Sequence, residues 1–250
     1  MTDNERHALE LINVKKSVST LELCEALGIS ESTSRRLLLR LSDRGAIRKY
    51  HGGGMSIDYH SIRNGIQHRF EQHVDEKDRI AKEAALRVSP GSTIILLGGT
   101  TVYRMCKYLR GMKVTIITNS MIVFDALKDE QAAEILMLGG KFNRHEMEVS
   151  GVITNSNLKM LRADSLFMGT VSFHPRIGFL TDDINSTELY GLCMDATRTR
   201  YILADSSKLG TAGAAVTATC EQLDCLITDN ALNNDIAMEF QQVGLKVLLV

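Results

Sequence analysis

The sequence predicts an α/β protein in which a small N-terminal head precedes a larger domain built on a mostly parallel sheet. The head is indicated by short amphipathic helical patterns that lead into a basic, glycine-ended hairpin. The sheet is indicated from residue 93 onward, where short apolar runs alternate with helical patterns, because strands covered on both faces carry few polar residues. We expect the head at 1–57, a linker at 58–75 and the sheet domain at 76–250.

The composition is that of an ordinary globular protein, with 44% apolar and 24% charged residues in a chain of 250. A formal charge of -1 excludes a protein that coats nucleic acid indiscriminately, so any such binding must be local. No apolar run approaches the roughly 20 residues of a membrane helix, and the first ten residues are too polar for a signal peptide, which predicts a cytoplasmic protein. The five cysteines are scattered and odd in number, which indicates buried thiols.

Two successive short helices are predicted in the head. Ser19 and Glu22 have the S-x-x-E spacing of a capping box, which begins a helix at about residue 20. Gly28 ends that helix, and Ser30 is placed to cap the second one. An earlier helix over residues 4–14 supports the pair.

The second helix has an apolar side and a basic side. Ser34, Leu37, Leu38 and Leu41 recur at i, i+3, i+4 and i+7, so this side is fit for burial, while the arginines point elsewhere. Arginine forks suit phosphate oxygens or the O6/N7 edge of guanine, and short hydroxyl side chains approach DNA closely. Exposed arginines on short helices are also common in domains that never contact nucleic acid.

A basic hairpin follows this helix. Gly45 is expected to end the helix, residues 47–51 have the pattern of a strand, and three glycines from Gly52 to Gly54 allow a tight return. The combination of helix, turn, basic helix and glycine-ended hairpin favours DNA binding over the simpler interpretation. The predicted DNA contacts are Ser32, Thr33, Ser34, Arg35, Arg36, Arg40, Arg48, Lys49 and His51.

Seven apolar runs are predicted as strands of the sheet, and helices such as 102–109 and 232–243 lie between them. The runs are Thr93 to Leu97, Val114 to Thr118, Ile135 to Leu138, Leu166 to Met168, Tyr201 to Ala204, Cys225 to Thr228 and Leu245 to Val250.

Ligands of such sheets bind outside the carboxyl ends of the strands. Four of the runs are followed by Gly, Thr, Asn, Asp or Lys, which suits a phosphorylated polyol: amides and a lysine for the phosphate, Asn and Asp for hydroxyls. Each element alone also has a structural explanation, because Gly-Gly commonly makes a turn and Ser or Thr commonly caps a helix. The predicted ligand residues are Gly98, Gly99, Thr100, Thr101, Asn119, Gly139, Gly140, Lys141, Asp205 and Lys208.

The head resembles the winged helix-turn-helix of the DeoR-type bacterial regulators, whose usual pattern is L-G-V-S-x-x-T-I-R-R-D-L followed by a Gly and by R-x-H-G-G. Ser34 stands where the family usually has Ile, and Leu37 where it usually has Asp. The matching residues are Leu27, Gly28, Ser30, Thr33, Arg35, Arg36, Leu38, Leu41, Gly45, His51, Gly52 and Gly53.

The resemblance continues through the C-terminal half, where Leu97 and Gly98 replace the family's usual Asp-Ser and so remove a carboxylate and a hydroxyl. It implies a fold similar to ribose-5-phosphate isomerases, a phosphosugar effector, and Asp164 as a further ligand residue. The matches are Lys77, Ile80-Ala81, Gly99 to Thr101, Thr118 to Ser120, Gly139-Gly140, Gly151, Asp164 with Phe167, Asp205 to Lys208, and Ile227 to Asp229.

The expectation is a DNA-binding transcriptional regulator, a repressor of a carbohydrate operon that a sugar phosphate releases from its operator. Paired heads are needed for useful discrimination, so a homodimer or homotetramer is expected. The alternative is an isomerase-like enzyme, whose acid/base pair would come from Asp164, Asp205 and Lys208. No cofactor is expected, and His145 with two nearby glutamates is interpreted as a solvated loop rather than a metal site.

Overall fold

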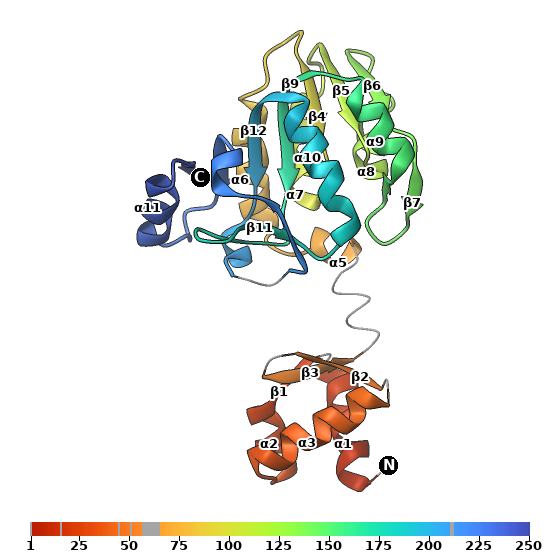
Figure 1. Ribbon diagram of the computed structural model, residues 1–250, viewed down its shortest axis with the longest axis vertical. Coiled ribbons are helices and arrows are strands. Elements are labelled where there is room, and N and C mark those ends of the chain that lie inside the picture. Colours follow the sequence, from red (N-terminus) through yellow and green to blue (C-terminus); the bar gives the residue numbers. More distant parts are fainter. Residues whose placement is uncertain (1, 16, 45, 51, 57–65, 211–212) are drawn as a thin grey trace. The chain divides into compact units, whose positions relative to one another are not determined.

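The computed structural model describes residues 2–15, 17–44, 46–50, 52–56, 66–210 and 213–250. The chain forms two compact units, Met1–Arg69 and Phe70–Val250, and each has its own apolar core (Figure 1). The first part of the predicted linker lies outside the described residues. Its remainder contains the short helix α5 (Ile66–Phe70) and the start of α6 (Val74–Ala85).

The first unit has the three predicted helices and a small sheet. The helices are α1 (Asp3–Lys15), α2 (Thr20–Leu27) and α3 (Glu31–Asp43). In the sheet, β3 (Gly53–Ser56) pairs antiparallel with both β1 (Ser17–Ser19) and β2 (Ile47–Tyr50). The hairpin of β2 and β3 is the predicted wing, whereas β1 was not foreseen. Gly45 and His51, to which the sequence assigned a helix end and a DNA contact, lie outside the described residues.

The core of the first unit lies between the three helices and the hairpin. It contains Ile12 of α1, Leu23 of α2 and the predicted apolar side of α3. Gly54 allows the hairpin to approach this core closely, because a Cβ there would lie 2.7 Å from Cδ2 of Leu38. The amphipathic pattern of α3 therefore determines which of its sides is left for a partner.

The second unit contains a seven-stranded sheet in the order β15-β14-β12-β9-β4-β5-β6, and every neighbouring pair in it is parallel. All seven predicted apolar runs are strands of this sheet. Their bounds are β4 Thr93–Leu96, β5 Val114–Thr118, β6 Ala133–Met137, β9 Ala163–Gly169, β12 Thr197–Leu203, β14 Cys225–Thr228 and β15 Lys246–Leu249.

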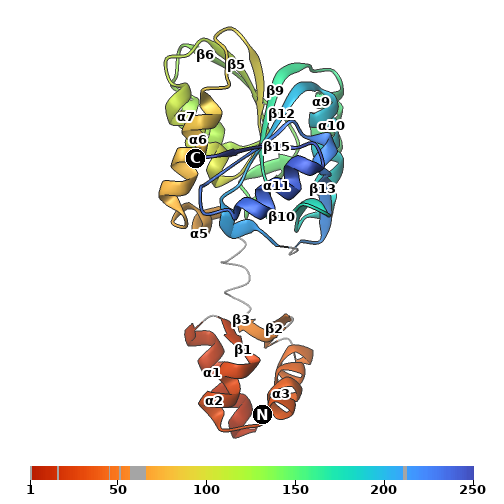
Figure 2. The same ribbon diagram turned by 90° about the vertical axis from the view of Figure 1, so that its left-hand side faces the viewer.

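Helices cover both faces of the sheet (Figure 2). Alternate residues of each strand enter opposite layers, so Ile94 packs in the layer with α6, α7 (Thr100–Leu109) and α8 (Met121–Leu127). Ile95 packs in the other layer, which contains α9, α10 and α11. The bounds of these helices are Val152–Lys159, Thr187–Asp195 and Asn234–Gln242.

Short strands outside the main sheet were not predicted, because runs of three or four residues carry little periodicity. One is the hairpin of β7 (Lys141–Asn143) and β8 (Glu148–Ser150). The other is the sheet of β10 (Ser172–His174), β11 (Gly178–Thr181) and β13 (Ala215–Ala218). Within the described ranges, no helix is long and apolar enough to cross a membrane.

Asp229 anchors the turn that follows β12, a turn that contains the short 3₁₀ helix η2 (Ser206–Lys208). The side chain is 1% exposed, and it accepts hydrogen bonds from Ser206 N–H (2.6 Å), the Ser206 hydroxyl (2.8 Å) and Ala231 N–H (3.0 Å). Burial opposes its ionisation, but these hydrogen bonds outweigh burial and lower the pKa of Asp229. The turn is thus held against the end of β14 by an ionised carboxylate.

Replacing Asp229 with Asn should lower the free energy of unfolding by about 2 kcal/mol at neutral pH, since hydrogen bonds to a charged acceptor are lost. The carboxylate contributes this stability above the unfolded pKa of about 4, and the contribution is lost as the pH falls through the lower folded pKa. The difference in melting temperature between wild type and Asp229→Asn should therefore be largest near neutral pH and shrink below about pH 4. A difference that stays constant over this range would contradict the assignment.

Candidate nucleic-acid interface and ligand site

The α2–turn–α3 segment has the geometry that the sequence predicted. The Ser19 hydroxyl accepts from Glu22 N–H (3.1 Å), and the Glu22 carboxylate accepts from Ser19 N–H (2.8 Å), so the capping box is complete. Gly28 follows α2 with φ 62°, a left-handed conformation that glycine adopts without strain. Ser30 caps α3 by accepting from Thr33 N–H at 3.4 Å. These caps fix where each helix begins and where α2 ends.

The outward side of α3 is polar and basic. Ser32, Arg35, Arg36 and Arg40 are exposed there, and Lys49 is exposed on β2. Local contacts hold some of them: Arg35 pairs with Glu31, and Arg36 Nε donates to the Ser32 carbonyl at 3.4 Å. The Thr33 hydroxyl lies 2.9 Å from that of Ser30 and is therefore part of the cap. Arg48 also lies on β2.

Ser34 is the exception among the predicted DNA contacts. It is fully buried, and its hydroxyl donates to the Thr20 carbonyl at 3.2 Å, which ties α3 to the start of α2. Its position in the i, i+3, i+4, i+7 series places it on the core side, so the side chain cannot reach DNA. The inclusion of Ser34 in the predicted interface was wrong.

Two features of this surface were missed from the sequence. Glu5 of α1 is 1% exposed and accepts from Arg44 at 3.0 Å, while Arg40 lies 3.6 Å away, so part of the positive charge at the end of α3 is paired internally. Leu39 is 44% exposed and, with Arg36 and Arg40, lines a shallow depression on α3. Its position out of phase with the buried leucines was the available signal.

The residues that follow the strands meet at the carboxyl edge of the main sheet, as predicted. Gly98 and Gly99 lie between β4 and α7, Thr100 and Thr101 begin α7, Asn119 follows β5, and Asp205 follows β12. Lys208 donates from Nζ to the Thr170 carbonyl at 2.6 Å, which places its ammonium group over the end of β9. Thr170 was not predicted as part of this edge. The polar residues that follow β4, β5, β9 and β12 thus lie at the same carboxyl edge of the sheet.

Several side-chain atoms along this edge are buried without a hydrogen-bond partner. Such atoms are rare, because burying an unpaired polar group costs about 1–3 kcal/mol. At a sheet edge that binds ligands in other α/β proteins, they are the groups that a ligand would satisfy. They are Thr101 Oγ1, Asn119 Oδ1, Ser120 Oγ, Asp205 Oδ2 and, at the end of β14, Thr228 Oγ1.

The Gly139-Gly140 turn is tied to α9 instead. Gly139 N–H donates to Asn157 Oδ1 at 3.2 Å, and the Thr154 hydroxyl donates to the Gly139 carbonyl at 2.7 Å. A Cβ at Gly140 would lie 2.1 Å from Thr154 Oγ1, so glycine is needed for this contact. The Gly139 amide is therefore not available to an anion, and the structural explanation holds for it. Lys141 is exposed at the start of β7.

Asp164 lies at the opposite edge of the sheet. It is the second residue of β9, and its carboxylate accepts from the N–H of Thr93, the first residue of β4, at 2.9 Å. Since all seven strands are parallel, a residue at the start of a strand is separated from the carboxyl edge by the length of that strand. The prediction that Asp164 contacts the same ligand as Asp205 was wrong.

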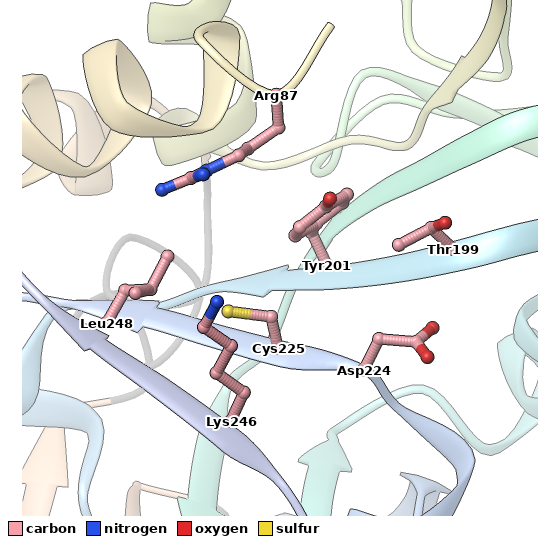
Figure 3. A pocket seen from close by; sticks show the side chains of 7 residues that line it. All are labelled: Arg87, Thr199, Tyr201, Asp224, Cys225, Lys246 and Leu248. Atoms are coloured by element: carbon pink, nitrogen blue, oxygen red, sulfur yellow. The ribbon is translucent and has the colours of Figure 1, made fainter.

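A small depression of about 120 Å³ opens beside the starts of β12, β14 and β15 (Figure 3). Figure 3 shows Arg87 extending over the sheet on the side of Leu248, with Cys225 and Lys246 on the strands below. Burial raises the pKa of the Cys225 thiol to about 11, so the thiol is not ionised at neutral pH. None of the predicted ligand residues lines this depression.

In the described part of the chain, no group of three or more His, Cys, Asp or Glu residues could hold a metal ion. The five cysteines are free, and burial raises the pKa of Cys106 and Cys193 to about 12.

Known proteins are similar to both units. Residues 6–60 match the DeoR-like helix-turn-helix domain, and residues 72–230 match the DeoR C terminal sensor domain. The HTH-type transcriptional regulator GolR of Listeria innocua is 30% identical over 98% of this chain and 97% of its own. The lactose phosphotransferase system repressor of Staphylococcus epidermidis is 30% identical over 88% of this chain and 89% of its own.

A solved ribose 5-phosphate isomerase from Methanocaldococcus jannaschii covers 54% of each chain at 18% identity with a TM-score of 0.41, a likeness too slight to assign a function. The two matched domains follow one another along almost the whole chain, and the helix-turn-helix and the parallel sheet have the geometry described above. The chain belongs to the DeoR family of DNA-binding transcriptional regulators.

Proposed function

We propose that this regulator represses genes of carbohydrate use and is released from its operator when a sugar phosphate binds the second unit. The name of the Staphylococcus epidermidis relative, a lactose phosphotransferase system repressor, supports both the sign of regulation and the class of regulated gene. On the DNA side, α3 lies in the major groove with Ser32, Arg35 and Arg36 toward base edges. Arg40, Arg48 and Lys49 contact phosphates, and His51 is the remaining proposed DNA contact.

The observation that carries the effector part of the proposal is the row of buried, unpaired polar atoms at the carboxyl edge. A hydroxyl-rich ligand supplies both donors and acceptors, so it pairs the Thr101 hydroxyl, the Asn119 carbonyl oxygen and the Asp205 carboxylate at once. Lys208, whose ammonium group lies over the end of β9, serves the phosphate. Gly98, Gly99 and Thr100 line the same edge, and Lys141 approaches from β7.

Binding without turnover is the second part of the proposal. An isomerase needs an acid/base pair beside the bound sugar. Of the three residues from which a pair could be assembled, Asp164 lies at the other edge of the sheet, and the Asp205 carboxylate already accepts a hydrogen bond from Ser207. The names of two relatives, a transcriptional regulator and a repressor, support this interpretation.

Arg36→Ala should weaken operator binding by about 1–3 kcal/mol and relax the preference at one base position, because a bidentate contact to guanine is lost.

Lys49→Ala should weaken the binding of all DNA sequences alike and lower the slope of log affinity against log salt by about 1, the effect of one phosphate contact. Both are measured by gel shift with a DNA fragment that the protein selects from its own genome. Lys82→Ala on α6 is the control for loss of one positive charge. Unchanged affinity and preference in Arg36→Ala would assign recognition to another helix.

Thr101→Val should have opposite effects on the free and the bound protein. Removing a buried hydroxyl without a partner should leave the melting temperature of the free protein unchanged or raise it. The same change should reduce the rise in melting temperature produced by a panel of hexose and pentose monophosphates. For the wild type, a ligand at a hundred times its Kd stabilises the folded protein by about 2.7 kcal/mol. Thr199→Val, beside the depression of Figure 3, is the matched control. Isomerised product in the panel would favour the enzyme alternative.

Paired heads are required for useful discrimination, because one small module makes few base contacts. We therefore expect a homodimer or homotetramer at micromolar concentration in sedimentation velocity experiments, with two heads per operator. A monomer both with and without DNA would contradict this.

A further inference from the structure

The β7–β8 hairpin brings a carboxylate to the carboxyl edge of the main sheet. Met121 N–H donates to the Met147 carbonyl and Val149 N–H to the Asn119 carbonyl, each at 2.8 Å, so β8 runs beside the end of β5. Glu148 lies between these two bonds, and its Oε2 accepts from Asn119 Nδ2 at 3.2 Å. Asn119 has a second, unpaired polar atom, Oδ1, at the same place.

The Glu148 side chain occupies the space that a side chain at position 98 would fill. A Cβ on Gly98 would lie 1.7 Å from Glu148 Oε1 and 2.2 Å from its Cδ, so only glycine at position 98 is compatible with this placement. The backbone of Gly98 is outside the left-handed region, which means that its conformation does not itself require glycine. Glycine at position 98 is thus explained by the glutamate.

A carboxylate at the ends of β4 and β5 restricts which part of a ligand can lie there. Ionised oxygens only accept hydrogen bonds, so they favour a hydroxyl or an ammonium group and repel a phosphate or a carboxylate. Lys208 Nζ lies at the end of β9, which is next to β4 and second from β5 in the sheet, so ordinary strand spacing places it roughly 5–10 Å from the carboxylate. A polyol chain with a phosphate at one end can span this separation.

We propose that Glu148 selects the effector: it accepts a hydrogen bond from a hydroxyl or ammonium group at the end of the ligand remote from the phosphate. This inference rests on the proposed sugar-phosphate sensing and assigns the ligand its direction, with the phosphate toward Lys208. It also assigns the chemical class of the effector, which is a phosphorylated polyol or amino polyol and not a phosphorylated sugar acid. Gly98 is the positioning residue that leaves room for the carboxylate.

The test compares two ligands that differ only at the remote end, glucitol 6-phosphate and 6-phosphogluconate. Dissociation constants are taken from the dependence of melting temperature on ligand concentration. Wild type should bind glucitol 6-phosphate more tightly. Glu148→Gln keeps the size of the side chain and removes its charge, so it should weaken the binding of glucitol 6-phosphate and strengthen the binding of 6-phosphogluconate. The ratio of the two dissociation constants should change by about tenfold, the effect of one charge-assisted hydrogen bond.

Gly98→Ala gives an independent arm, because the added Cβ must displace the flexible Glu148 side chain without straining the backbone. It should shift the ligand preference as Glu148→Gln does, and the double variant should shift it no further. Glu134→Gln, on the exposed face of β6, removes a carboxylate elsewhere and should leave the preference unchanged.

If Glu148→Gln weakens the binding of both ligands equally, the carboxylate only supports the hairpin, and the inference is wrong. An unchanged preference in Gly98→Ala would also overturn it. If the wild type responds to neither ligand and to no other sugar phosphate of the panel, the proposed effector class fails, and this inference fails with it.

Discussion

The parallel direction of seven neighbouring strands is the constraint on which the second unit depends. The central strands β4 and β9 and the strand β14 are buried on both faces over most of their length, so their residues serve the core, and those beyond their ends are left for a ligand. Because every strand points the same way, the segments after β4, β5, β9 and β12 must all emerge at one edge. Residues more than 100 positions apart in the chain, such as Thr101 and Asp205, therefore lie at one edge of the sheet without any further requirement on the sequence.

The same constraint explains which parts of the site the sequence could predict. Continuous apolar runs are a strong signal, so all seven strands were predicted, and with them the position of Asn119 and Lys208 beyond strand ends. Asp164 was misplaced because its choice rested on a resemblance and ignored strand direction. Glu148 could not be predicted, because β8 has three residues, too few for a periodic pattern in the sequence. The contact between Glu148 and Gly98 depends on how the β7–β8 hairpin packs against the sheet.

In the first unit, local signals were sufficient for the helices. The capping residues Ser19 and Ser30 and the C-terminal Gly28 act within a few positions of the chain, and each has the predicted role. The assignment of side chains to the DNA face was less secure, since the polar Ser34 belongs to the core through its bond to the Thr20 carbonyl. Its residue type suggested contact with DNA, but its position in the helical repeat places Ser34 on the buried side of α3.

The separation of the two sides of α3 matters for engineering new operator specificity. The core side and Gly54 form a closed set, in which Leu38 leaves no space for a side chain on the facing strand. The outward positions 32, 35, 36 and 39 make no contribution to the head's buried apolar cluster. A combinatorial library can therefore randomise those four positions together while Ser34, Leu38 and Gly54 stay constant, and its members should differ in the sequences they recognise far more than in their ability to fold.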